Sequence, residues 1–254
     1  NNTENGKTAA GGDYYYSYGE GLFIVLNTNN YNVAEHQNTI EEAVKAYPDA
    51  KWRVVTIHQD IYGSGLDHSD TDGMILRTQL TPIFDANDID VVLQGHDHTY
   101  SRSKLLYGDG QTHESYEFQL NADGTDYDWD HAANTETGEQ IALYPEDGDE
   151  TAQAALDAFH EDNQCYTIED VEGNTVTDPE GTLYMTANSA SGSKYYELVS
   201  TQQDYIAARS QNWLPSYSII TMDAQKFSID TYQITDDGSV EAIDDTFTIE
   251  KTAK

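Results

Sequence analysis

Several residue types are scarce in this chain of 254 residues, and each shortage narrows what the protein can be. The single cysteine, Cys165, cannot form an intrachain disulfide, so cysteine usage leaves the redox compartment open. We expect Cys165 to be a small buried apolar residue. The chain has only 12 lysines and arginines but 46 aspartates and glutamates, which gives a formal net charge of −34. Because this charge repels nucleic-acid backbones and anionic lipid surfaces, nucleic-acid binding is not expected.

Long apolar runs are also lacking. The longest candidates, 22–26 and 91–93, are far shorter than the roughly 18 residues that a membrane span needs, so no span is expected. The polar start at 1–7 has neither an initiator methionine nor a charged-then-apolar leader, which favours a processed product or a fragment without its signal peptide. Acidity and the 19 tyrosines favour an extracellular or cell-surface bacterial protein.

The apolar pattern predicts an α/β core. Two short aromatic and β-branched runs separated by Gly19-Glu20-Gly21 predict a hairpin. Apolar residues then recur at helical spacing in two segments, and each of these segments precedes a buried strand. The predicted elements are strands at 14–18 and 22–26, a helix at 33–47, a strand at 52–58, a helix at 73–85 and a strand at 89–93. Alternating strands and helices are typical of α/β proteins.

Histidines follow both buried strands. His58 ends the first, and His96 and His98 follow the second, after the sharp turn that Gly95 permits. Loops at the carboxyl ends of strands are where ligands collect in α/β sheets, so the three imidazoles can converge on metal ions. A lone histidine such as His58 is more often only a polar strand end, but Gly-His-Asp-His directly after an apolar strand is harder to explain by chance.

The sequence around these histidines resembles a known family. Residues 95–102, GHDHTYSR, are similar to the terminal Gly-His-x-His signature of calcineurin-like phosphoesterases, and the Tyr-x-Arg extension resembles the purple acid phosphatase branch. Residues 54–65, VVTIHQDIYGSG, resemble the preceding histidine block of that family. Residues 181–198 resemble the strand and small-residue loop that returns to the metal site. The resemblance covers roughly 12–106 and 180–235.

The resemblance implies a dinuclear centre of Fe, Zn or Mn, with two ions about 3 to 4 Å apart, where a metal-bound hydroxide attacks a phosphate ester, most commonly a monoester. It assigns His58 and His96 to one ion and His98 to the other. His68 matches a histidine that contacts phosphate and protonates the leaving oxygen. The alternative for His68 is a solvated loop histidine between Asp67 and Asp70. A small phosphorylated substrate is the expected partner, while substrate, metal and oligomeric state remain open.

The sequence departs from the family in its first three blocks. The Asp-x-His, Gly-Asp and Gly-Asn-His blocks that supply carboxylate and Asn ligands are missing, and Gly12-Asp13 does not stand in their place. Three histidines without a carboxylate cannot hold two hard cations tightly. We therefore expect the C-terminal half of the four-layer αββα metallophosphoesterase sandwich, inactive without upstream residues. A secreted acidic binding module that keeps a phosphatase scaffold without chemistry is the alternative.

The remaining sequence is interpreted as one partial catalytic domain with an insertion. We assign its core to residues 12–106 and 180–250, and we interpret residues 107–179 as an acidic insertion. The insertion is expected to form a lid or rim over the site. Helical spacing predicts a helix at 150–160 within that segment. Alternation at 217–222, 227–234 and 247–249 predicts antiparallel strands of the second sheet.

Overall fold

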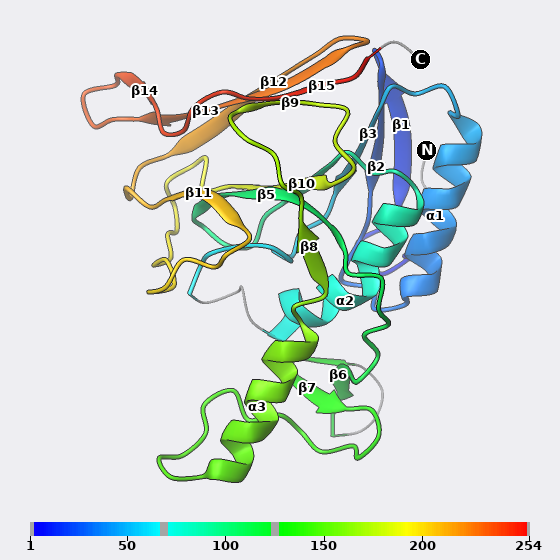
Figure 1. Cartoon of the computed structure of the whole chain (residues 1–254), viewed down its shortest axis with the longest axis vertical. Coiled ribbons are helices and arrows are strands. Elements are labelled where there is room, and N and C mark those ends of the chain that lie inside the picture. The colour runs from blue at the N-terminus through cyan, green and yellow to red at the C-terminus, as the bar shows by residue number, and fades with distance from the viewer. Residues whose placement is uncertain (1–2, 67–70, 123–126, 253–254) are drawn as a thin grey trace.

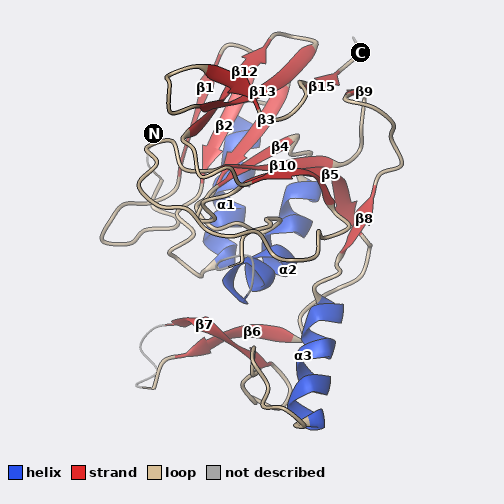
Figure 2. Cartoon of the chain, turned by 90° about the vertical axis from the view of Figure 1, so that its left-hand side faces the viewer, coloured by secondary structure: helices blue, strands red, loops and turns tan. Residues whose placement is uncertain are grey.

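The structure is a computed structural model that describes residues 3–66, 71–122 and 127–252. It contains an α/β fold with two stacked sheets and two helices on the outer face of the first sheet (Figures 1 and 2). One helix and one hairpin form a further lobe, whose apolar residues pack into the same core cluster as the helices of these layers. The predicted α/β class is confirmed.

The first sheet has eight strands. Its order is β1-β2-β3-β4-β10-β5-β11, with β8 paired to β5. The strands are β1 (Tyr14–Tyr18), β2 (Gly21–Val25), β3 (Trp52–Thr56), β4 (Val91–Gln94), β5 (Tyr100–Gly108), β8 (Tyr166–Ile168), β10 (Thr182–Ala187) and β11 (Ile206–Ser210). The predicted hairpin is β1 and β2, which pair in antiparallel register, and its turn uses Gly19 at a φ of 56°. From β2 through β3 and β4 to β10 the strands are parallel.

Two helices cover one face of this sheet. They are α1 (Val33–Ala46) and α2 (Thr71–Ala86), which lie side by side in Figure 2 and close to the predicted ranges. Their apolar stripes, including Ile40 and Phe84, are fully buried against Ile24, Val55 and Val92 of the sheet. This alternation of helix and parallel strand brings the carboxyl ends of β3 and β4 to the same edge.

The second sheet covers the other face. Its main strands are β12 (Ser216–Met222), β13 (Lys226–Ile234), β15 (Phe247–Glu250) and β9 (Thr175–Thr177), in that order, with β14 (Val240–Ala242) paired to β13. Between the sheets, Trp52 and Val91 of the first pack with Phe227, Ile229 and Phe247 of the second. The three predicted C-terminal strands are confirmed as antiparallel neighbours in this sheet.

The segment 107–179 forms the lobe and also contributes to the layers. Its helix is α3 (Glu150–Asp162), as predicted, and Asp149 caps it by accepting a hydrogen bond from the Ala152 N–H at 3.0 Å. The hairpin pairs β6 (Tyr116–Leu120) with β7 (Tyr127–Asn134). However, β8 joins the first sheet and β9 joins the second. The segment therefore completes both sheets, and its role as a lid stays a prediction.

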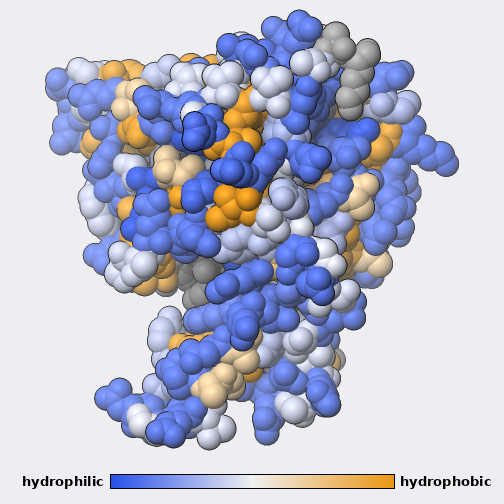
Figure 3. Space-filling model, in the orientation of Figure 1, coloured by the Kyte–Doolittle hydropathy of each residue, from blue (hydrophilic) through white to orange (hydrophobic). Residues whose placement is uncertain are grey.

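The surface reflects the composition. In the view of Figure 3 hydrophilic residues predominate, and hydrophobic residues appear as small separate patches. Over the described ranges, no helix combines the length and apolarity needed to cross a membrane.

Candidate metal centre at the carboxyl edge of the first sheet

His58 and His96 meet where β3 and β4 end. The Nδ1 of His96 lies 3.1 Å from the Nε2 of His58, and the two ring centroids are 4.8 Å apart. The His58 side chain is exposed and that of His96 is half-buried. The chain is held in this arrangement because the Gly95 N–H donates to the His58 carbonyl at 3.0 Å. Two strand ends thus present facing imidazole nitrogens to solvent.

The backbone at His96 is strained. Its φ is 68°, in the left-handed region that non-glycine residues seldom occupy. The Asp97 N–H donates to the Gly95 carbonyl at 2.7 Å, so His96 is the central residue of a γ-turn of the rare positive-φ kind. Backbone strain of about 1–3 kcal/mol collects at functional sites, and here it falls on a predicted metal ligand.

His98 is oriented by the loop that follows β10. Its Nδ1 lies 2.9 Å from the Lys194 carbonyl, which can only accept, so Nδ1 carries the proton and Nε2 is left as a potential metal ligand. The ring of Tyr196 contacts the His98 ring at a centroid distance of 5.1 Å. Gln211 donates to the His98 and Tyr196 carbonyls, each at 2.6 Å. The family-like segment 181–198 therefore lies beside His98.

Two carboxylates near the histidines turn into the protein. Asp60 is hydrogen-bonded by Gln94 and, at 2.8 Å, by Thr186. Asp97 accepts from the Gly65 N–H at 2.8 Å, and a Cβ at Gly65 would come within 2.4 Å of that carboxylate. Burial raises the pKa of Asp60 well above its ordinary value, and the negative charge of Asp97 raises it further. These carboxylates therefore shape the loops beneath the histidines.

The loop that leads toward His68 is tied to the 188–199 loop. Leu66 donates to the Glu197 carbonyl at 2.8 Å, and Val199 donates to the Ser64 carbonyl at 2.9 Å. Arg209 donates to the Ser64 hydroxyl at 3.0 Å and to the Val199 carbonyl at 2.8 Å. His68 itself lies outside the described residues, so its role stays a prediction.

Arg77 of α2 supports the same loop from below. It is buried, and its guanidinium carbon lies 4.5 Å from the ring centre of Tyr62 and 5.1 Å from that of Tyr205. Its Nε donates to the Ile61 carbonyl at 2.6 Å, and one terminal nitrogen donates to the Asn163 carbonyl at 3.2 Å. A single side chain thus connects the start of the site loop with the end of α3.

The Tyr-x-Arg part of the motif is structural. Tyr100 and Arg102 both donate to one carboxylate oxygen of Asp244, at 2.6 and 2.7 Å. The guanidinium of Arg102 also lies over the Phe247 ring at 4.7 Å. Burial is the main cause that raises the pKa of Tyr100, and the negative charge of Asp244 raises it further. This cluster joins β5 of the first sheet to the segment before β15 of the second.

The geometry at His58 and His96 fits one metal ion. Two imidazole nitrogens held at about 2.0–2.1 Å from a shared ion lie roughly 3 to 3.4 Å apart, and the observed separation is 3.1 Å. The set is nevertheless incomplete, because among the described residues no three His, Cys, Asp or Glu side chains assemble to hold a metal. The structure therefore places two histidine nitrogens at a separation that one ion could bridge, with an oriented third histidine nearby and without a closed coordination shell.

Three further described histidines have other surroundings. His36 is fully buried, with Nδ1 at 2.8 Å from Asp13 and Nε2 at 2.8 Å from the Asn30 carbonyl. Asp13 thus serves packing at the start of α1. His113 pairs with Asp109 and Asp162 in the lobe. Burial lowers the pKa of His160 in α3.

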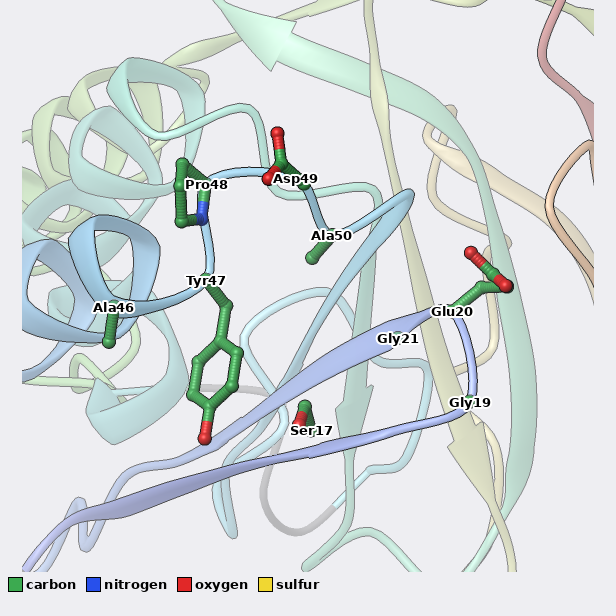
Figure 4. A pocket seen from close by; sticks show the side chains of 9 residues that line it. All are labelled: Ser17, Gly19, Glu20, Gly21, Ala46, Tyr47, Pro48, Asp49 and Ala50. Atoms are coloured by element: carbon green, nitrogen blue, oxygen red, sulfur yellow. The ribbon is translucent and has the colours of Figure 1, made fainter.

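A shallow pocket lies at the opposite end of the sheet (Figure 4). It is lined by the β1–β2 turn and the end of α1: Ser17, Gly19, Glu20, Gly21, Ala46, Tyr47, Pro48, Asp49 and Ala50. Gly21 begins β2, which runs parallel to β3, and His58 follows the far end of β3. This pocket is therefore separate from the histidine site.

Sequence reasoning missed the residues that orient the site. Lys194 acts through its backbone carbonyl and Gln211 through a side-chain amide between two strands. Neither position carries a periodic or motif signal. The small-residue loop at 181–198 pointed to the region but not to these contacts.

The comparisons with known proteins support the fold. No family model matches the sequence, and no curated protein sequence matches it. Among solved structures, purple acid phosphatase PPD1 from yellow lupin (Lupinus luteus) seeds is similar at a TM-score of 0.55 and 13% identity. The match covers 94% of this chain and 32% of the lupin chain. At this identity the likeness shows a shared α/β fold alone.

Two further structures are more distant. GAP50, described as the anchor in the inner membrane complex of Plasmodium, matches at a TM-score of 0.48 and 12% identity, covering 95% of this chain and 54% of that one. A Vps29 mutant from Entamoeba histolytica matches at a TM-score of 0.20 and 14% identity, covering 66% of this chain and 87% of its own. Neither carries weight here. The chain spans about a third of the lupin protein and about half of GAP50.

Proposed function

We propose that this chain is the C-terminal, histidine-bearing part of a metal-dependent phosphoesterase that hydrolyses phosphate esters, foremost monoesters. The observation that carries the proposal is the His58–His96 pair, whose facing nitrogens are 3.1 Å apart at the strand ends. The positive φ of His96 supports it, because backbone strain tends to collect at functional sites. The α/β architecture shared with the lupin enzyme is compatible with it.

In the proposed site His58 and His96 hold one ion and His98, through Nε2, holds a second. A pair of Fe, Zn or Mn ions would supply Lewis-acid polarisation of the ester and an activated water. The chain's own residues set the ligand directions: the Lys194 carbonyl fixes the tautomer of His98, and the buried Asp97 fixes Gly65. We assign His68 to protonation of the leaving oxygen.

Two hard cations also need oxygen ligands. Asp60 and Asp97 are engaged by Thr186 and Gly65 and are buried, so we propose that carboxylate and amide ligands come from a polypeptide segment outside these 254 residues. The site would then be complete in the longer polypeptide, which we propose to be extracellular or at the cell surface.

The first test measures zinc binding to the chain by competition with a chromophoric chelator. His58→Ala and His96→Ala are each expected to remove the site, because each takes away half of the ligand pair. His160→Gln, in the lobe, is the matched control and should bind as the unmodified chain does. Equal zinc affinity in all four proteins would overturn the ligand assignment.

The second test measures turnover of an aryl phosphate by a polypeptide that includes the segment encoded upstream of Asn1. His98→Ala is expected to abolish turnover, and His68→Ala to reduce it by roughly 10²-fold or more, the scale of general acid catalysis. Unchanged kinetics in the second variant would remove His68 from the mechanism.

The incomplete ligand set favours a second candidate, an acidic binding module that keeps the scaffold without chemistry. That candidate predicts that the extended polypeptide has no metal-dependent turnover. An upstream sequence that lacks Gly-Asp and Gly-Asn-His blocks would favour it further.

A further inference from the structure

A group of aromatic residues, one exposed and two half-buried, lies beside the proposed metal site, on the loops that follow β10 and β11. Tyr195 and Trp213 form an edge-to-face pair with ring centroids 6.0 Å apart. Tyr196 is next in the chain and contacts the His98 ring. We call Lys194, Tyr195, Tyr196 and Trp213 the aromatic platform.

Trp213 is presented to solvent in a strained conformation. Its side chain is 53% exposed, although indole is among the largest apolar groups. Its φ is 58°, which is a genuine outlier for a bulky residue. A large apolar ring left in water contributes little to the free energy of folding. The exposed ring and the strained backbone of Trp213 therefore do not stabilise the hydrophobic core. The combination is typical of a residue kept for contact with a ligand.

The platform is fixed to the metal site through Gln211. The Trp213 N–H donates to the Gln211 side-chain oxygen at 3.1 Å. The amide nitrogen of the same side chain donates to the carbonyls of His98 and Tyr196 at 2.6 Å. One side chain therefore sets the position of the Trp213 backbone relative to that of His98. A ligand that contacts both places meets a preorganised surface.

Lys194 adds a positive charge to the platform. The Nζ of Lys194 lies over the Tyr196 ring at 4.5 Å, a cation–π contact that holds an exposed cation next to the ring that touches His98. The chain has only 12 cationic side chains against 46 acidic ones. A positive group beside a proposed phosphate site in such a protein is suited to an anion that the remaining surface repels.

We propose that the aromatic platform binds the leaving-group side of the substrate, and that the substrate class is a phosphate monoester carrying a flat aromatic ring, such as a nucleoside monophosphate. The ring stacks on Trp213, whose indole Tyr195 contacts edge to face, while Lys194 faces the phosphate near His98. This inference rests on the proposed function for the position of the phosphate. The ring contact is independent of it, since stacking on aromatic side chains needs no metal.

The test uses three probes with the zinc-loaded chain: adenosine 5′-monophosphate, ribose 5-phosphate and adenosine. Saturation-transfer difference NMR of each ligand gives its affinity. We expect the monophosphate to bind about tenfold more tightly than ribose 5-phosphate, the scale of one stacked base. Trp213→Ala should bring the two ligands to the same affinity and remove adenosine binding. Trp213→Phe keeps a ring and should retain most of the preference, which separates loss of stacking from misfolding.

Two controls complete the design. Lys194→Ala is expected to weaken both phosphorylated ligands alike and leave adenosine unchanged. Tyr18→Ala removes another exposed aromatic ring, 76% exposed on β1, and should change nothing. If phosphate binding fails both here and in the polypeptide extended upstream of Asn1, while adenosine binding still depends on Trp213, the proposed function is wrong and the ring subsite stands. If Trp213→Ala binds all three probes with the same affinities as the unmodified chain, the proposal that the aromatic platform binds the substrate ring is overturned.

Discussion

The two halves of the segment 95–102 have opposite characters. In Gly95–His98 the backbone is strained at His96 and the side chains of His96 and His98 reach toward solvent. In Thr99–Arg102 every side chain is buried, and Tyr100 and Arg102 share the Asp244 carboxylate. One continuous motif thus combines a strained half whose histidines reach toward solvent with a buried half that joins the sheets. The second half of the motif is therefore explained by structure, and only the first half is open to a functional role.

The largest effect is expected from Arg102→Ala. Its guanidinium and the Asp244 carboxylate are 6% and 13% exposed, so the substitution leaves a buried carboxylate without its ion-pair partner. Loss of one partner of a buried pair lowers the free energy of unfolding by about 3 to 5 kcal/mol. Denaturant unfolding measures it. Lys7→Ala removes an exposed pair with Glu4 and should change stability by less than about 1 kcal/mol; similar losses in both variants would contradict the structural role.

A smaller loss is expected from Tyr100→Phe. The variant keeps the ring but removes the hydroxyl that donates to Asp244 at 2.6 Å, while Arg102 still pairs with that carboxylate. Hydrogen bonds to charged groups contribute about 1.5 to 3 kcal/mol. Thermal unfolding should show this loss, whereas Tyr18→Phe on the exposed edge should be neutral. An unchanged midpoint for Tyr100→Phe would mean that Arg102 alone holds Asp244.

The first half should respond in the opposite direction. His96→Gly removes a side chain from a positive-φ position, and we expect a gain of about 1 kcal/mol in unfolding free energy, together with loss of the zinc pair. For a domain of this size that gain raises the melting temperature by roughly 2–4 °C. His58→Ala also removes the zinc pair but should not be stabilising. A destabilised His96→Gly protein would show that the turn is not strained.

The smallest effect concerns pH at the far end of β5. Burial raises the pKa of Asp85, although the Gly108 N–H donates to it at 2.7 Å. Folding therefore favours the protonated form, and this contribution to stability is present below the ordinary aspartate pKa and lost as pH rises through the raised value. The free energy of unfolding of Asp85→Asn, relative to that of the unmodified chain, should therefore increase as pH rises from about 4 to 7.

Asp237 provides a control with the opposite sign. Hydrogen bonds lower the pKa of Asp237, and the largest contribution comes from the Thr235 hydroxyl. The stabilisation by the charged Asp237 is therefore present above the ordinary aspartate pKa and lost as pH falls through the lowered pKa. The free energy of unfolding of Asp237→Asn, relative to that of the unmodified chain, should therefore decrease as pH rises. Parallel pH curves for the two variants would refute the assignment of the Asp85 shift to burial.

Local patterns predicted the elements and the proximity of His58 and His96. Helical spacing at Ile40 and Ala43 and the apolar run before His58 are local signals, and parallel neighbours place their carboxyl ends together. The remainder depends on distant partners. Asp244 lies 142 residues from Arg102, and Gln211 lies 113 residues from His98. Short strands such as β8 and β9 are too brief for periodicity to distinguish them from loop.

Arg77 has a consequence for how the molecule opens. Its guanidinium holds the carbonyls of Ile61 and Asn163, one in the loop below the histidines and the other at the end of α3. Neither carbonyl can separate from it without exposing a buried cation. The amide protons of the α3 end and of the site loop should therefore exchange with solvent in one cooperative event, so the lobe and the histidine site behave as a single unit of local unfolding.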